Sequence, residues 1–289
     1  MVEQAIYEHL TAQTGLTQFL TTYNSLPAVF NQKAPADPDE LWAKGPQYPR
    51  LVFFVDLQGD PARIMGGSLS VDIQCPDDGK PPEELEPLVR ELIHGWFFSN
   101  GTFTTAAQWK ATNYFTEPTE QVVGCTVSFD LLAFPVLTTV EPDVIDRLNS
   151  WTALKTGLYA INHAALPASA WKPAAEESAI YWRLAREEPV GWIPDTFQTV
   201  WRTAVVRGHI FSLDNKTAAT AARQIITGLY ADKRLMVQGE APVMVNRNNT
   251  ADMTADPLRT GQLTVEATFG VIVRAANPNV FNHITTREG

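Results

Sequence analysis

Residues 83–97 read EELEPLVRELIHGWF, and this stretch decides the predicted fold. Its apolar side chains recur at the i, i+3, i+4, i+7, i+8 spacing of a single helix face. They are Leu85, Leu88, Val89, Leu92, Ile93, Trp96 and Phe97. The pattern predicts an amphipathic helix over residues 83–97. The carboxylates of Glu83, Glu84 and Glu86 fall in its first turn, where they complement the positive end of the helix dipole.

A second stretch with the same pattern lies 133 positions further along, at residues 217–230, which read TAATAARQIITGLY. Arg90 aligns there with Arg223, and Gly95 aligns with Gly228. The seven apolar positions fall on Ala218, Ala221, Ala222, Ile225, Ile226, Leu229 and Tyr230. Any two amphipathic helices align by pattern, so the flanking sequence decides whether the match is a repeat.

The flanks of the two helices also correspond. Each helix is preceded and followed by two strand-like runs, at 51–57, 68–75, 109–115 and 124–134 in the first half and at 179–184, 204–211, 243–245 and 263–273 in the second. Each half also opens with a helix-like stretch that reaches a Leu-Pro-Ala, at 26–28 and 166–168. The order α-β-β-α-β-β therefore occurs twice. We predict an α+β fold of two tandem repeats, each an antiparallel sheet with helices packed on one face.

Length and charge support a division at mid-chain. A chain of 289 residues suggests about two domains. Residues 1–142 carry 7 basic and 18 acidic side chains, net −11, whereas residues 143–289 carry 15 and 14, net +1. We therefore predict a first repeat over 1–142, a second over 143–275, and a C-terminal arm over 276–289.

The predicted sheets each leave one face without helices. The strands there carry large side chains such as Trp109, Phe129, Tyr181 and Trp182, which predicts oligomerisation or packing between domains. Alternatively, the long segments 29–49 and 185–201 cover these faces. The loops 185–198 and 247–260 are typical of contacts between subunits, and the sequence leaves open whether they lie at an interface or in a lumen.

A search for catalytic chemistry gives no candidate site. Ser169-Ala-Trp-Lys172 and Lys155-Thr-Gly157 fit two penicillin-recognising signatures, but their order is reversed and no Ser-Asp-Asn accompanies them. The histidines have no metal-ligand spacing: His9, His94, His163, His209 and His283. Cys75 and Cys125 are interpreted as small hydrophobic strand residues. We predict no catalytic, cofactor-binding or metal-binding residues, no cofactor and no enzymatic activity.

The composition narrows the class of protein further. Two cysteines exclude a disulfide framework, and a net charge of −10 argues against a dedicated nucleic-acid binder. No apolar run reaches the ~18 residues of a membrane span, and the N-terminus MVEQAIYEHL has no signal-peptide pattern.

The element order resembles that of the tail terminator (tail completion) proteins of long-tailed bacteriophages. The resemblance is carried by the opening helix, the proline-punctuated loop before Tyr48-Pro-Arg-Leu-Val-Phe-Phe-Val55, the hairpin strand Leu69-Ser-Val-Asp-Ile73, the helix at 83–97 and the strand Gly124-Cys-Thr-Val-Ser-Phe129. It covers each half through order and periodicity, without a diagnostic motif. This chain carries two copies where the usual member has one.

The resemblance implies a structural virion protein that forms a ring, terminates the tail tube and joins it to the head or neck. Its implied partners are other copies of itself, the tail tube protein and the head–tail connector or neck proteins, with DNA only passing through the lumen and no membrane. Sixfold tubes imply either six chains or three chains with pseudo-sixfold symmetry. The implied location is the virion tail or neck, after assembly in the host cytoplasm.

Two other functions remain open. The chain can be another neck adaptor or a cap of a contractile tail-like apparatus. It can also be a non-viral small-molecule binding protein or enzyme on a duplicated α+β scaffold.

Overall fold

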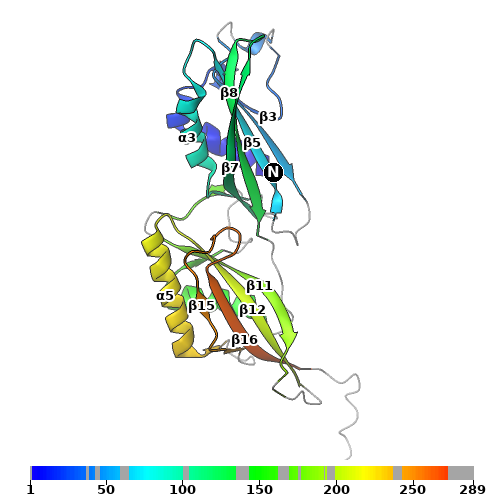
Figure 1. Ribbon diagram of the computed structural model, residues 1–289, viewed down its shortest axis with the longest axis vertical. Coiled ribbons are helices and arrows are strands. Elements are labelled where there is room, and N and C mark those ends of the chain that lie inside the picture. Colours follow the sequence, from blue (N-terminus) through cyan, green and yellow to red (C-terminus); the bar gives the residue numbers. More distant parts are fainter. Residues whose placement is uncertain are drawn as a thin grey trace, which may run out of the picture. The chain divides into compact units, whose positions relative to one another are not determined.

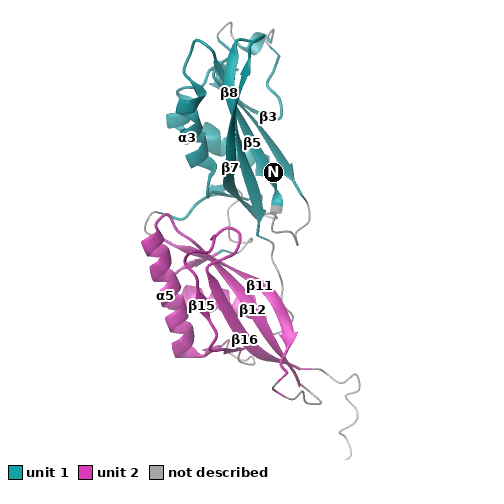
Figure 2. Ribbon diagram, in the orientation of Figure 1, with its two compact units in different colours: residues 1–136, 161–174 teal, residues 137–160, 175–289 magenta. Residues whose placement is uncertain are grey.

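The computed structural model describes residues 2–36, 39–42, 46–58, 65–99, 104–134, 143–161, 169–174, 177–191, 193, 199–236 and 243–272. The chain forms two compact units (Figure 2). Unit 1 comprises Met1–Val136 and Ile161–Ala174, and unit 2 comprises Leu137–Ala160 and Ala175–Gly289. The predicted boundary at 142/143 lies beside residues 135–142, which are outside the described residues, as is the predicted arm at 276–289.

The fold is α+β and consists mostly of two sheets with few helices, which confirms the predicted class. The elements of unit 1 are α1 (Val2–Thr11), α2 (Thr14–Thr17), β1 (Thr22–Tyr23), β2 (Leu26–Pro27), β3 (Val29–Asn31), η1 (Glu40–Trp42), β4 (Arg50–Leu57), β5 (Met65–Pro76), α3 (Pro82–Ile93), β6 (Phe97–Ser99), β7 (Thr104–Glu117), β8 (Val122–Ala133) and β10 (Ala170–Trp171). Its seven-stranded sheet has the order β10-β6-β7-β8-β5-β4-β3. All its pairs are antiparallel except β3 with β4.

The predicted helix at 83–97 is confirmed only as far as Ile93. Pro82 opens α3 at a position where the missing N–H is not needed, and Glu83 and Glu84 lie in the first turn. The backbone then leaves the helical region at His94, and Gly95 adopts a positive φ of 76°. The segment at 94–97 was therefore wrongly predicted as helix, because its apolar residues belong to a turn and to β6.

The core of unit 1 lies between the sheet and its helices. Strands β5 and β8 alternate: Leu69, Val71 and Ile73 point into the core, with Cys125 and Val127 beside them, all fully buried. Helix α3 contributes Leu85, Val89 and Ile93 to the same core. Each such side chain stabilises the fold by about 1.5–3 kcal/mol relative to exposure. Figure 1 shows α3 on one side of these strands.

Unit 2 has a shorter list of elements. They are α4 (Val144–Thr156), β9 (Tyr159–Ala160), β11 (Ala179–Pro189), β12 (Thr199–Phe211), α5 (Asn215–Asp232), β13 (Arg234–Leu235), β14 (Val243–Val245), β15 (Thr250–Ala251) and β16 (Leu263–Ile272). The sheet order is β13-β14-β16-β12-β11-β9, with β15 also paired to β16. The predicted helix at 217–230 is confirmed within α5.

Helices α4 and α5 cover one face of the second sheet. The Asp143 carboxylate caps α4 by accepting from the Ile145 and Asp146 amides at 2.9 and 3.1 Å. Trp151 of α4 packs on Gly228 of α5, where an added Cβ would meet the indole at 3.0 Å. Trp182, buried beneath the helices, donates its Nε1–H to the Thr152 hydroxyl at 3.1 Å.

The observed element order is longer than the predicted α-β-β-α-β-β order. Short strands such as β3, β6, β9 and β13 extend the edges of the sheets. Both units nevertheless share a connection: a hairpin (β4–β5 or β11–β12) is followed by a helix (α3 or α5), and the last strand (β8 or β16) pairs with the second strand of the hairpin.

Candidate assembly surfaces

The sheet of unit 1 has an open face on the side opposite to its helices. We define the first open face by Phe54, Ser70, Asp72, Thr126 and Ser128, which alternate along their strands with core residues. Thr126 donates to the Asp72 carboxylate at 2.6 Å, and the Phe54 ring is 50% exposed. This surface is therefore largely polar, with one prominent aromatic side chain.

Strand β7 has an unpaired edge. Its partner β6 pairs only with Thr104–Ala106, and no described strand pairs with this side of residues 110–117. Tyr114, on the same strand, is 54% exposed. An open strand edge carries unpaired backbone donors and acceptors, which favours strand addition from another chain.

A hydrogen-bonded cluster lies beside this edge, on the helix side of the sheet. The Trp109 Nε1–H donates to the Thr112 hydroxyl at 3.1 Å, and Thr112 donates to Glu86 at 2.9 Å. The Arg90 guanidinium lies over the Trp109 ring at 5.0 Å and 3.6 Å from Glu86. Glu86 is thus buried and partnered, and it lies beyond the first turn of α3, in which it was predicted.

Strand β11 also has an open edge, but this edge differs from that of β7 because it is protected against strand addition. Strand β9 pairs only with Ala179 and Ile180, so no described strand pairs with the outer edge of residues 181–189. A bulge between Leu184 and Arg186, charged side chains and the terminal Pro189 oppose strand addition there. The predicted loop 185–198 was partly wrong, since β11 continues to Pro189; residues 192 and 194–198 lie outside the described residues.

The sheet of unit 2 also has an open face opposite to its helices. We define the second open face by Tyr181, Arg183, Val205, Arg207 and His209, which occupy neighbouring positions of β11 and β12. Tyr181, Val205 and His209 are buried, and Arg183 and Arg207 are half-buried. Figure 1 shows α5 on the other side of this sheet.

The segment 252–261 covers one end of the second open face. His209 lies 2.8 Å from the Pro257 carbonyl and packs against the Tyr181 ring, with ring centroids 5.7 Å apart. Leu258 of the segment is buried, and Asp256 accepts from the Leu258 and Arg259 amides. Part of the loop 247–260, which was predicted to contact other subunits, therefore packs on its own unit.

The large side chains expected on the open faces are distributed differently. Phe129 and Trp182 are in the cores, and Tyr181 lies on the second open face but is buried. Trp109 is 38% exposed, but it lies on the helix side of its sheet. When the strand register is unknown, the sequence does not show which face of the sheet an aromatic residue occupies.

The ionisable groups singled out in the sequence occupy structural positions. Burial raises the pKa of Cys75 to about 11 and that of Cys125 to about 12, so both thiols are protonated at neutral pH and poorly nucleophilic. Burial also lowers the pKa of His9, whose Nε2 lies 2.8 Å from the Leu92 carbonyl. The exposed His94 accepts from the Trp109 amide, whereas His163 and His283 lie outside the described residues.

The two penicillin-signature matches have separate structural roles. Lys155 pairs with Asp232 at 3.1 Å, and Gly157 ends α4 with a left-handed φ of 71°. The Ser169 carbonyl accepts from the Ser99 amide beside β10, and Lys172 lies over the Trp96 ring at 5.9 Å. The two motifs belong to different units, which agrees with their reading as chance matches.

A shallow groove runs along the outer surface of α4 and α5. One part, of about 520 Å³, is lined by Trp151, Lys155, Arg223 and Asp232, and an adjoining part of about 440 Å³ by Ser178 and the start of α5. Among the described residues, no group of three or more His, Cys, Asp or Glu side chains is arranged to hold a metal ion.

Comparisons with known proteins give no assignment. No protein-family model, curated protein or solved structure matches this chain significantly. Within the described ranges, no helix has both the length and the apolar character needed to cross a bilayer.

Proposed function

We propose that this chain is a structural virion protein, which forms a ring that terminates a phage tail tube and joins it to the head or neck. The observation that carries the proposal is the construction of the two sheets, each with helices on one face and an open face on the other. Large self-assembling proteins use such faces and edges as interfaces. The resemblance in element order supplies the tail terminator class.

The proposal includes a tandem duplication. The shared hairpin–helix–strand connection of the two units supports it, as does the 133-residue spacing of the two helix patterns. Two copies per chain give a ring of either six chains or three chains, and we favour six, so that one copy meets the tube and the other the neck.

The ring uses head-to-tail contacts between different surfaces of neighbouring subunits. The open edge of β7 and the protected edge of β11 provide surfaces of unlike kind, and the charge difference between the halves supports a fixed register. No enzymatic step is part of the proposed role.

Negative-stain imaging of the purified chain, alone and with the tube protein of the same phage, tests the proposal. We expect closed rings that cap tube ends. Rings that bind a portal or neck protein but no tube would instead support a neck adaptor or the cap of a contractile apparatus.

A small-molecule binding protein is the second candidate, and the groove along α4 and α5 favours it. This alternative predicts a monomer or dimer, together with saturable ligand binding that Arg223→Ala weakens. Rings in the images, without such binding, would reject it.

A further inference from the structure

The second open face holds an arginine pair at its centre. Arg183 of β11 and Arg207 of β12 are directly opposite each other in the antiparallel register, and both side chains are half-buried. Arg207 donates to the Thr264 hydroxyl on the next strand. Arg183 forms no hydrogen bond or ion pair with any described residue.

Two like charges in this position oppose folding. Like charges directly opposite each other on an antiparallel pair destabilise the sheet. Partial burial lowers the pKa of Arg183, and the neighbouring Arg207 lowers it further, while Tyr181 acts in the opposite direction. The Arg183 guanidinium remains charged at neutral pH, because arginine has a very high intrinsic pKa.

The nearby carboxylates do not neutralise the pair. Glu187 pairs with Arg202, and Glu188 pairs with Arg186. Glu266, on the neighbouring strand, accepts from the Asn248 side chain at 3.4 Å. Asp256, at the covered end of this face, raises the pKa of His209 but does not act on that of Arg183. The centre of this face is therefore deficient in negative charge and is suited to receive an anion from outside the unit.

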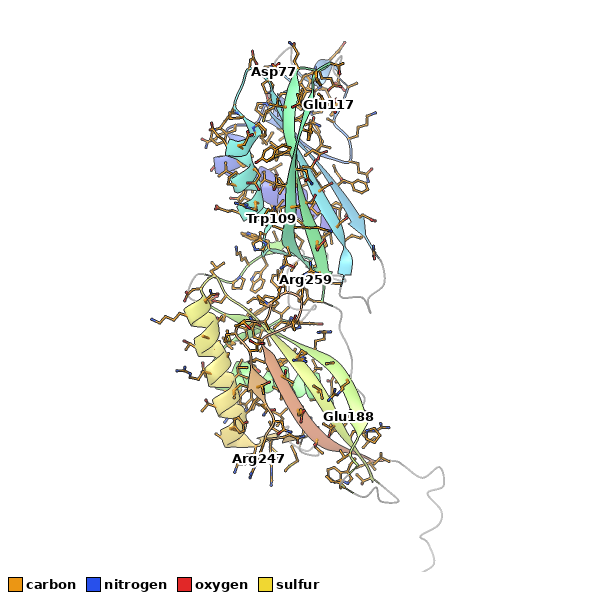
Figure 3. All side chains as sticks on the ribbon, viewed as in Figure 1. Asp77, Trp109, Glu117, Glu188, Arg247 and Arg259 are labelled. Atoms are coloured by element: carbon orange, nitrogen blue, oxygen red, sulfur yellow. The ribbon has the colours of Figure 1, made fainter. Side chains whose placement is uncertain are left out.

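Unit 1 offers carboxylates that form no ion pair with any described residue. Asp77 and Asp78 lie in the turn after β5, Glu117 and Glu120 lie at the turn between β7 and β8, and all four are exposed. The Asp77 amide donates to the Gln121 carbonyl at 3.0 Å, which holds the two turns together. Figure 3 shows Asp77 and Glu117 at the same end of the sheet. We name these four residues the acidic turns.

We propose that Arg183 and Arg207 receive the acidic turns of a second copy of this chain, so that each head-to-tail contact joins unit 2 of one subunit to unit 1 of the next. Guanidinium groups bind carboxylates with two parallel hydrogen bonds, which supplies orientation as well as attraction. A net charge of −10 favours protein carboxylates over nucleic-acid phosphates as the anion. The inference rests on the proposed ring and identifies one of its contacts.

A charge exchange between copies tests the contact. One variant carries Arg183→Glu and Arg207→Glu. A second reverses all four acidic turns, with Asp77→Lys, Asp78→Lys, Glu117→Lys and Glu120→Lys. Each alone places like charges at every contact, and we expect its self-association in sedimentation velocity at low salt to weaken about tenfold or more. In a ring of six chains, an equimolar mixture restores opposite charges at every contact, so we expect assembly to return as alternating hetero-oligomers. A ring of three chains cannot alternate and would keep one repulsive contact.

The matched control carries Lys233→Glu and Arg247→Glu, two exposed residues of unit 2 outside the second open face and outside the groove along α4 and α5, with the same change in net charge as the arginine variant. We expect it to assemble like the wild type. Circular dichroism and thermal unfolding of each variant separate a lost contact from a lost fold.

The outcomes distinguish the contact from the ring. Wild-type assembly that survives both reversals overturns the arginine contact and leaves the ring standing. Salt-dependent association that the reversals abolish, but without closed rings, supports the contact and rejects the ring. A wild type that stays monomeric at all concentrations rejects both, and a reversal that removes DNA binding without affecting assembly assigns the pair to phosphates and overturns the proposal.

Discussion

At the scale of single residues, close contacts of Trp182 fix the centre of the second core. Trp182 is fully buried beside Gly208, where an added Cβ would lie 2.6 Å from the indole and 3.0 Å from Leu263. The indole has little freedom to yield, since its Nε1–H is bound to Thr152. Glycine is thus required at position 208 because the Trp182 indole packs directly on its Cα.

Gly208→Ala tests this requirement. We expect the substitution to lower the free energy of unfolding by about 1–3 kcal/mol through overpacking, measured as a lower urea midpoint. Gly191→Ala is the control, because no atom lies within 4 Å of the position of its added Cβ. Equal midpoints for the two variants would contradict the packing described for Trp182.

His209 makes the free energy of unfolding depend on pH, and the direction of this dependence follows from its lowered pKa. Burial lowers its pKa to about 4, the Pro257 carbonyl opposes that shift, and Arg183 and Arg207 add to it. The unfolded chain binds the proton near pH 6.5 and the folded chain only near pH 4, so stability falls as the pH drops through this window. We expect the loss to reach about 3 kcal/mol.

Urea titrations at several pH values between 7 and 4, on the wild type and on His209→Gln, measure this contribution. The glutamine amide can still donate to the Pro257 carbonyl, but it does not titrate. A wild-type curve parallel to that of the variant would refute the assignment.

At the scale of helices and strands, the sequence predicted the long elements and missed the short ones. The periodic runs became α3, α5 and the long strands, because periodicity over eight or more residues reports a buried face. Strands of two or three residues, such as β9 and β10, carry no such period and are fixed by tertiary pairing. The end of α3 was missed because Gly95 was aligned with Gly228, which is inside a helix.

The site was less predictable than the fold. The open faces follow from the element order, but the arginine pair depends on the register of β11 with β12, which the sequence does not determine. Glu86 was misplaced for a related reason, since its burial depends on Thr112 and Arg90 reaching it from other positions.

The helix cap of α4 gives a prediction at this scale. Asp143→Ala removes the acceptor for two backbone amides at the start of α4, and we expect a loss of about 1 kcal/mol of unfolding free energy. Asp143→Asn keeps an acceptor and should remain close to the wild type in thermal and urea unfolding. A larger effect for asparagine than for alanine would contradict the capping role.

At the scale of the whole molecule, the chain consists of two sheet-based units that each present one open face. Unit 1 offers the open edge of β7 and the acidic turns, and unit 2 offers the arginine pair beside a covered histidine. Because these surfaces differ, the proposed head-to-tail contact can continue from subunit to subunit, and it gives a ring when the rotation between neighbouring subunits closes.

Native mass spectrometry of the intact chain, across a range of protein and salt concentrations, tests this central claim most directly. We expect a dominant species of six or three copies of the 32.0 kDa chain, which dissociates as the salt concentration rises. A chain that remains monomeric throughout, or that stops at symmetric dimers, would contradict it.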